Sequence, residues 1–174
     1  AWVSLTLSQA VLGTIVWAGS RLPGPWPWRD AGARPVSLRT AVLIPVYEEA
    51  PVRVAANALT MARALAVKCP GQFAVFLLSD TRSVDHWLHE EEVFRRAIAS
   101  APASCPLYYR NRAANEERKA GNVAEWVTRF GAAWDAMLVL DADSLMGDDC
   151  ICRLAARLEA NPDLGLIQSL PRIV

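Results

Sequence analysis

The sequence has no excess charge of either sign and few residues that bind soft metals. Its 18 lysine and arginine side chains balance 18 aspartate and glutamate side chains, so no overall field draws it to nucleic acid or to an acidic surface. Its two histidines, His86 and His89, have no third ligand nearby, and we interpret them as ordinary surface or packing residues. The cysteines show neither a zinc spacing nor a CxxC pair, and a chain of 174 residues needs no disulfide staples. We therefore interpret all of them as reduced thiols of the core or of helices: Cys69, Cys105, Cys150 and Cys152.

Charge is absent from the first twenty residues. A helix over residues 1–20 is long enough to cross a hydrocarbon core of about 30 Å, so this stretch predicts a transmembrane or membrane-interface helix. A buried helix is the alternative, because serine, threonine and glutamine dilute the apolar character. Residues 21–39 follow as a linker rich in proline, tryptophan and arginine, and its prolines prevent the helix from continuing. Because arginines follow the apolar stretch closely, the next domain is expected on the cytoplasmic side of a membrane.

From Thr40 onward, short apolar or β-branched runs alternate with longer helix-favouring stretches. The runs predict strands at 41–46, 73–79, 107–109, 136–140 and 164–168. The stretches between them predict helices at 51–68, 84–99, 121–130 and 149–161. This order indicates an α/β fold over residues 40–174, with a mainly parallel sheet flanked by helices. Ligands of such sheets bind beyond the carboxyl ends of the strands.

Acidic residues follow three of the predicted strands. Glu48 and Glu49 come after the first strand, Asp80 after the second, and Asp141 with Asp143 after the fourth. Any one of these alone is more often a turn or helix-cap residue. Their convergence on one edge of the sheet favours a ligand site instead.

The run Met137–Asp143, with the sequence MLVLDAD, is the most informative of these strand ends. A buried apolar strand that leads into two acids places charge close to the interior and needs a compensating partner. Residues i and i+2 of an extended chain lie about 6–7 Å apart on the same side, so Asp141 and Asp143 can converge on one hard divalent cation and its bound diphosphate. Oxygen ligands suit Mg²⁺ or Mn²⁺ rather than zinc, and such an ion would stabilise the charge on a departing nucleotide.

The stretch Arg118–Asn122, with the sequence RKAGN, lies at the start of a predicted helix. Free backbone N–H groups and the positive end of the helix dipole favour an anion there. Lys119 and Asn122 are candidate phosphate contacts, and Gly121 permits close backbone approach. A solvated basic loop, offset by the neighbouring glutamates, is the alternative.

Four motifs, taken in order, resemble family 2 inverting glycosyltransferases of the GT-A fold. They are Ala41–Glu49 (AVLIPVYEE), Leu78–Asp80 (LSD), Lys119–Asn122 (KAGN) and Leu140–Asp143 (LDAD). Longer stretches such as RKAGNVAEW and VLDADSLMGDDCICRL look like the glucans biosynthesis glucosyltransferase H family, inner-membrane enzymes that make osmoregulated periplasmic glucans. The resemblance covers essentially residues 40–174 and implies the N-terminal half of the catalytic GT-A domain.

The resemblance implies an inverting glucosyltransferase that transfers glucose from UDP-glucose to a growing β-glucan. It implies the bacterial inner membrane as location, a glucan acceptor, and a periplasmic glucan-biosynthesis protein as partner. The general base is expected beyond Val174, so the segment alone is expected to be inactive. The roles that the resemblance implies are Glu49 and Asp80 around the uridine, Lys119 near the diphosphate, Asp141 by the nucleotide sugar, Asp143 on the metal, and Gln168 near the acceptor or donor sugar.

Two other functions are compatible with parts of the pattern. In haloacid-dehalogenase-type phosphatases, an aspartate two residues before another at the end of an apolar strand is the nucleophile. That motif normally opens its fold, whereas Asp141 follows at least three predicted strands. A non-catalytic fragment that binds a nucleotide sugar is the second alternative.

Overall fold

The computed structural model describes residues 36–112 and 114–169. The membrane helix predicted at 1–20 and most of the linker predicted at 21–39 lie outside the described residues. Within the described ranges, no helix combines the length and the apolar character needed to cross a membrane.

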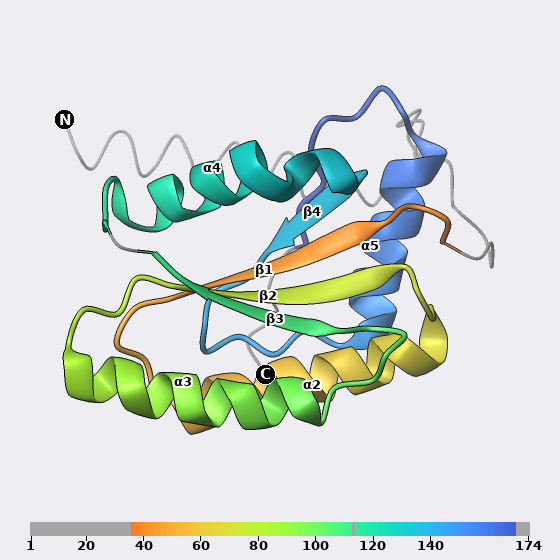
Figure 1. Ribbon diagram of the computed structural model, residues 1–174. Coiled ribbons are helices and arrows are strands. Elements are labelled where there is room, and N and C mark those ends of the chain that lie inside the picture. Colours follow the sequence, from red (N-terminus) through yellow and green to blue (C-terminus); the bar gives the residue numbers. More distant parts are fainter. Residues whose placement is uncertain (1–35, 113, 170–174) are drawn as a thin grey trace, which may run out of the picture.

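Four strands form a parallel sheet in the order β3-β2-β1-β4 (Figure 1). The two central strands consist almost entirely of apolar residues and are buried along their length, as expected for strands that helices cover on both faces. This arrangement confirms the predicted α/β fold with a mainly parallel sheet. The bounds are β1 (Thr40–Val46), β2 (Phe73–Ser79), β3 (Leu107–Asn111) and β4 (Ala136–Val139).

The helices cover the two faces of the sheet unequally (Figure 1). On one face, α2 (Pro51–Lys68), α3 (Val84–Ala99) and α5 (Asp148–Ala160) enclose the larger core. On the other face lies α4 (Arg118–Phe130), followed by the short 3₁₀ helix η1 (Gly131–Ala133). The smaller core under α4 contains Ala41, Leu43, Leu78 and Trp126.

The strand predicted at 164–168 is wrong. Leu164 donates its backbone N–H to the carbonyl of Asn161 in a turn after α5, at 3.0 Å, and Leu166 is 80% exposed. Residues 164–169 pair with no strand in the part of the chain that the structure describes. An apolar run satisfies the pattern for a strand, but without a neighbouring strand it has no ladder to join.

The structure contains the four cysteines as free thiols, and the sulfurs of Cys69 and Cys152 lie 2.7 Å apart. Burial raises the pKa of the Cys105 and Cys152 thiols to about 12. Both thiols are therefore protonated at neutral pH and poor nucleophiles. This agrees with their interpretation as structural residues.

Candidate active site

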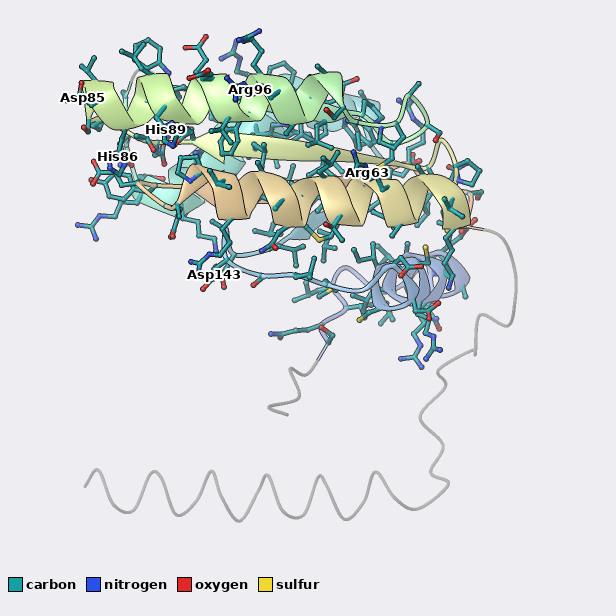
Figure 2. The ribbon with its side chains drawn as sticks, turned by 90° about the horizontal axis from the view of Figure 1, so that it is seen from below. Arg63, Asp85, His86, His89, Arg96 and Asp143 are labelled. Atoms are coloured by element: carbon teal, nitrogen blue, oxygen red, sulfur yellow. The ribbon has the colours of Figure 1, made fainter. Side chains whose placement is uncertain are left out.

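A cleft of about 700 Å³ lies at the edge of the sheet where the strands end. Parallel strands bring their carboxyl ends to the same edge, and the acidic residues after β1, β2 and β4 meet there. Five residues predicted from the sequence line this cleft together: Glu49, Asp80, Lys119, Asp141 and Asp143. Figure 2 shows Asp143 on the loop that follows β4. The remaining lining residues are Pro45, Val46, Tyr47, Asn115, Arg118 and Ala142.

One wall of the cleft contains a buried ion pair between Asp80 and Arg112. The Arg112 guanidinium donates from its Nε to one Asp80 oxygen and from its second terminal nitrogen to the other oxygen at 3.0 Å. Both side chains are nearly inaccessible to solvent, with 6% and 5% exposed for Arg112 and Asp80. The hydrogen bonds to Asp80 raise the pKa of Arg112 above its usual value, so this two-point pair keeps both charges in the interior.

Arg112 also holds the loop that leads into α4. Its guanidinium donates to the backbone carbonyl of Glu116 at 2.9 Å and to that of Arg118 at 2.8 Å. Two residues of this loop, Glu117 and Arg118, adopt left-handed backbone conformations with φ of 54° and 50°. Such conformations persist only where the surroundings enforce them, and the bonds from Arg112 provide that restraint.

Gly121 is required for the tight packing of this loop. A Cβ atom built at this position would lie 2.1 Å from the backbone oxygen of Glu116. The close backbone approach predicted for Gly121 is therefore a contact between α4 and the backbone of the loop that precedes it. The packing places Arg118 and Lys119, at the start of α4, on the cleft.

The other wall of the cleft is exposed. Lys119 forms an ion pair with Asp141, and their side chains are 49% and 70% exposed. Asp143 follows on the same loop and also lines the cleft. Because both partners remain in contact with solvent, Lys119 can exchange Asp141 for an anionic ligand at little cost.

The structure does not bring Asn122 or Gln168 into this cleft. Asn122 is completely buried; its amide donates to the carbonyl of Leu78 at 3.0 Å, and its oxygen accepts from Arg110. It therefore ties α4 to β2, and its hydrogen-bonding groups do not face a phosphate. Gln168 is exposed in the segment after α5 and is not among the residues that line the cleft.

The sequence motifs predicted no site role for Arg112, Asn115, Arg118 or Tyr47. The position of Arg112 at the end of β3, next to the strand that ends in Asp80, was the available signal. Strand order decides whether two such strand ends are neighbours, and the spacing of the motifs does not reveal that order.

The donor set of the cleft suits a hard divalent cation shared with a ligand. Asp141 and Asp143 offer carboxylate oxygens, and magnesium is commonly held by one or two carboxylates together with substrate phosphates and water. Within residues 36–112 and 114–169, no three aspartate, glutamate, histidine or cysteine residues gather to hold an ion by themselves. His86 and His89, on α3, are exposed (Figure 2).

The fold defines the class of protein. A solved mannosyltransferase from Pyrobaculum calidifontis, in complex with GDP-Man and Mn²⁺, superposes with a TM-score of 0.60 at 20% sequence identity. The match covers 88% of this chain and 42% of the mannosyltransferase. The chain therefore has the GT-A glycosyltransferase fold.

Sequence comparison finds similar proteins that share one name. The chain is 45% identical over 176 residues to glucans biosynthesis glucosyltransferase H of Bradyrhizobium diazoefficiens. It is 42% identical over 179 residues to the protein of that name from Xylella fastidiosa, and 41% identical over 174 residues to that from Vibrio cholerae. The matches cover 99% or 100% of this chain and between 23% and 27% of the relatives. No protein-family model matches the chain.

These identities confirm the resemblance to glucosyltransferase H that longer stretches such as RKAGNVAEW indicated. The chain is homologous over essentially its whole length to the glucans biosynthesis glucosyltransferase H proteins, and it spans about a quarter of the length of the relatives it matches. The phosphatase alternative is not favoured, because both the sequence relatives and the structural neighbour are glycosyltransferases.

Proposed function

We propose that this chain forms the donor-binding part of an inverting glucosyltransferase that transfers glucose from UDP-glucose to a growing β-glucan. The observation that carries the proposal is the meeting of Glu49, Asp80, Lys119, Asp141 and Asp143 in one cleft at the carboxyl edge of a GT-A sheet. Homology to glucosyltransferase H supports glucose as the transferred sugar.

The two walls of the cleft suit different parts of a nucleotide sugar. Glu49 and Asp80 lie on the wall formed by β1 and β2, where carboxylate oxygens would accept hydrogen bonds from the uracil and ribose donors. Lys119 and Arg118 lie at the start of α4, where cationic side chains would hold the diphosphate. Asp141 would orient the sugar next to the diphosphate.

Asp143, together with Asp141, would hold Mg²⁺ or Mn²⁺ between the protein and the diphosphate. The bound ion would supply electrophilic stabilisation of the departing UDP. When the nucleotide sugar enters the cleft, Lys119 would release Asp141 and bind the phosphate oxygens. The Asp141 carboxylate would then be free to bind the metal ion. This exchange needs exposed partners, and the exposure of the pair meets that need.

The wider setting of the reaction follows from the same proposal. We place the catalytic domain on the cytoplasmic side of the bacterial inner membrane, where UDP-glucose would be the donor and a glucan chain the acceptor. A periplasmic glucan-biosynthesis protein would act as partner on the other side. The names of the homologous proteins support glucan biosynthesis, and the apolar sequence of residues 1–20 with the arginines that follow supports the placement at a membrane.

Calorimetry on the protein at its natural length tests the metal assignment. Asp143→Ala is expected to abolish Mg²⁺- or Mn²⁺-dependent binding of UDP-glucose, because the variant removes an oxygen ligand that no neighbouring side chain replaces. Asp85→Ala is the matched control, since Asp85 is an exposed aspartate on α3 (Figure 2). Unchanged binding by Asp143→Ala would contradict the assignment.

A competition experiment tests the donor. UDP-glucose is expected to bind with higher affinity than GDP-mannose, the ligand of the structural neighbour. Equal affinity for the two donors would show that the cleft does not recognise uridine, and the proposal for Glu49 and Asp80 would be wrong.

A further inference from the structure

Helix α3 buries a carboxylate while it leaves large apolar side chains in solvent. Glu90 is 1% exposed, whereas Val84 and Leu88 on the same helix are 62% and 56% exposed. Glu90 shares its buried position with Phe94 and Ala97, one and two turns further along the helix. Burial of a carboxylate is costly unless hydrogen bonds compensate for the lost water, so this position calls for an explanation.

Two hydroxyl groups satisfy the buried carboxylate. Thr81 donates to one Glu90 oxygen at 2.7 Å, and Tyr109 donates to the other at 3.1 Å. Burial, together with the charge of Glu90, raises the pKa of Tyr109 above its ordinary value, so the phenol keeps its proton and remains a donor. Among the described residues, no lysine, arginine or histidine forms an ion pair with Glu90.

The Thr81 hydroxyl connects Glu90 to the turn after β1. A threonine hydroxyl has one hydrogen to donate, and Glu90 accepts it, so the oxygen lone pairs are left for an incoming donor. That donor is the backbone N–H of Glu48, at 3.1 Å. Thr81 is itself 3% exposed, and its backbone carbonyl accepts from Asn111 at 3.2 Å. The carboxyl ends of β1, β2 and β3 are thereby joined.

The turn that receives this hydrogen bond is strained. Glu48 has a φ of 53°, in the left-handed region that residues other than glycine seldom occupy. The residue that follows it, Glu49, lines the donor cleft. If Glu48 relaxed to an ordinary conformation, the direction of the chain at Glu49 would change.

We propose that Glu90 is a positioning residue of the donor cleft. It orients the Thr81 hydroxyl, which holds Glu48 in its left-handed conformation and so directs Glu49 into the cleft. Glu90 itself contacts no ligand. The inference rests on the proposed function, because it is there that Glu49 is assigned to the uridine.

The first test compares two substitutions of Thr81 in the protein at its natural length. Thr81→Val keeps the shape of the side chain and removes the hydroxyl, and we expect the Kd for UDP-glucose to rise about tenfold. Thr81→Ser keeps the hydroxyl and is expected to bind within about twofold of the wild type. Thr81→Ala provides the same comparison if the valine variant does not fold. Equal binding by the serine and valine variants would overturn the proposal.

The second test removes the carboxylate that orients the hydroxyl. Glu90→Met is similar in length and cannot accept a hydrogen bond from Thr81, so the Kd is expected to rise about as much as in Thr81→Val. Glu91→Met is the matched control, because Glu91 is the next residue of the helix and is exposed. A Kd unchanged in Glu90→Met would contradict the inference.

A double-mutant cycle separates positioning from a general loss of structure. In a Glu49→Ala background, Thr81→Val is expected to have almost no further effect on the Kd, because the group that it positions is absent. A full additional tenfold loss would overturn the role assigned to Glu90 and Thr81. If Glu49→Ala alone left UDP-glucose binding unchanged, the assignment of Glu49 under the proposed function would fail instead.

Discussion

The two walls of the cleft each contain an ion pair, and the two pairs differ in burial. Arg112 and Asp80 form theirs in the interior, where about a twentieth of each side chain is exposed. Lys119 and Asp141 form theirs in solvent, with about half of the lysine and more than two thirds of the aspartate exposed. A buried pair is expensive to break because each charge is left without water. An exposed pair is weak and is easily exchanged.

The difference indicates that the two ion pairs have different roles in one site. The buried pair has structural partners on several sides, because Arg112 also bonds the carbonyls of Glu116 and Arg118. It fixes the shape of the cleft before any ligand arrives. The exposed pair leaves both side chains accessible, so under the proposed function Lys119 would bind a diphosphate and Asp141 a metal ion.

The largest expected effect tests the buried wall. Arg112→Met removes the guanidinium and leaves the Asp80 carboxylate buried without a partner, so the free energy of unfolding is expected to fall by about 3–5 kcal/mol. Urea denaturation followed by circular dichroism measures this loss. Arg96→Met is the control, because Arg96, labelled on α3 in Figure 2, pairs with Glu92 in solvent. This variant should change stability by less than about 1 kcal/mol.

A second variant sharpens the interpretation of that loss. Asp80→Leu combined with Arg112→Met removes both charges, and replacement of a buried pair by apolar groups is often nearly neutral. The double variant is therefore expected to be more stable than Arg112→Met alone and still unable to bind UDP-glucose. If the double variant were as unstable as the single one, the bonds from Arg112 to the loop, rather than its pairing with Asp80, would dominate.

Much of the fold could be predicted from the sequence because its strands and helices have clear periodicity. The bounds predicted for the helices at 51–68 and 84–99 agree with the structure. The convergence of Glu49, Asp80, Asp141 and Asp143 followed from one rule, that parallel strands end at the same edge. The strand at 164–168 failed because pairing depends on a neighbouring strand, which local composition does not encode.

The details of the site were less predictable than its location. Asn122 belongs to a motif beside Lys119, and the sequence favoured a phosphate contact for both residues. The motif does not reveal which of its side chains reach the cleft, and Asn122 is buried against β2, where its amide donates to the carbonyl of Leu78. Glu90 had a weak signal, since it shares a helix face with Phe94 and Ala97, four and seven residues later.

A smaller effect tests the loop between the two walls. Gly121→Ala would bring a Cβ atom against the backbone oxygen of Glu116, and relief of that overlap requires the loop or α4 to move. We expect a loss of about 1–3 kcal/mol in the free energy of unfolding, even though alanine favours a helix over glycine. Gly147→Ala is the matched control, because a Cβ atom there meets nothing within 4 Å. Equal stability of the two variants would show that the loop is free to adapt.

The smallest effect on stability is expected at the exposed wall. Asp141→Asn removes the charge that Lys119 pairs with, and such exposed pairs contribute about 0–1 kcal/mol, so thermal denaturation should hardly change. Metal-dependent binding of UDP-glucose should nevertheless weaken by at least about tenfold, because a neutral amide is a poorer ligand for a hard cation than a carboxylate. Glu92→Gln breaks another exposed pair, with Arg96, and should alter neither stability nor binding. A large loss of stability in Asp141→Asn would mean that both ion pairs stabilise the fold. The contrast between the two walls requires the exposed pair to affect ligand binding and not stability.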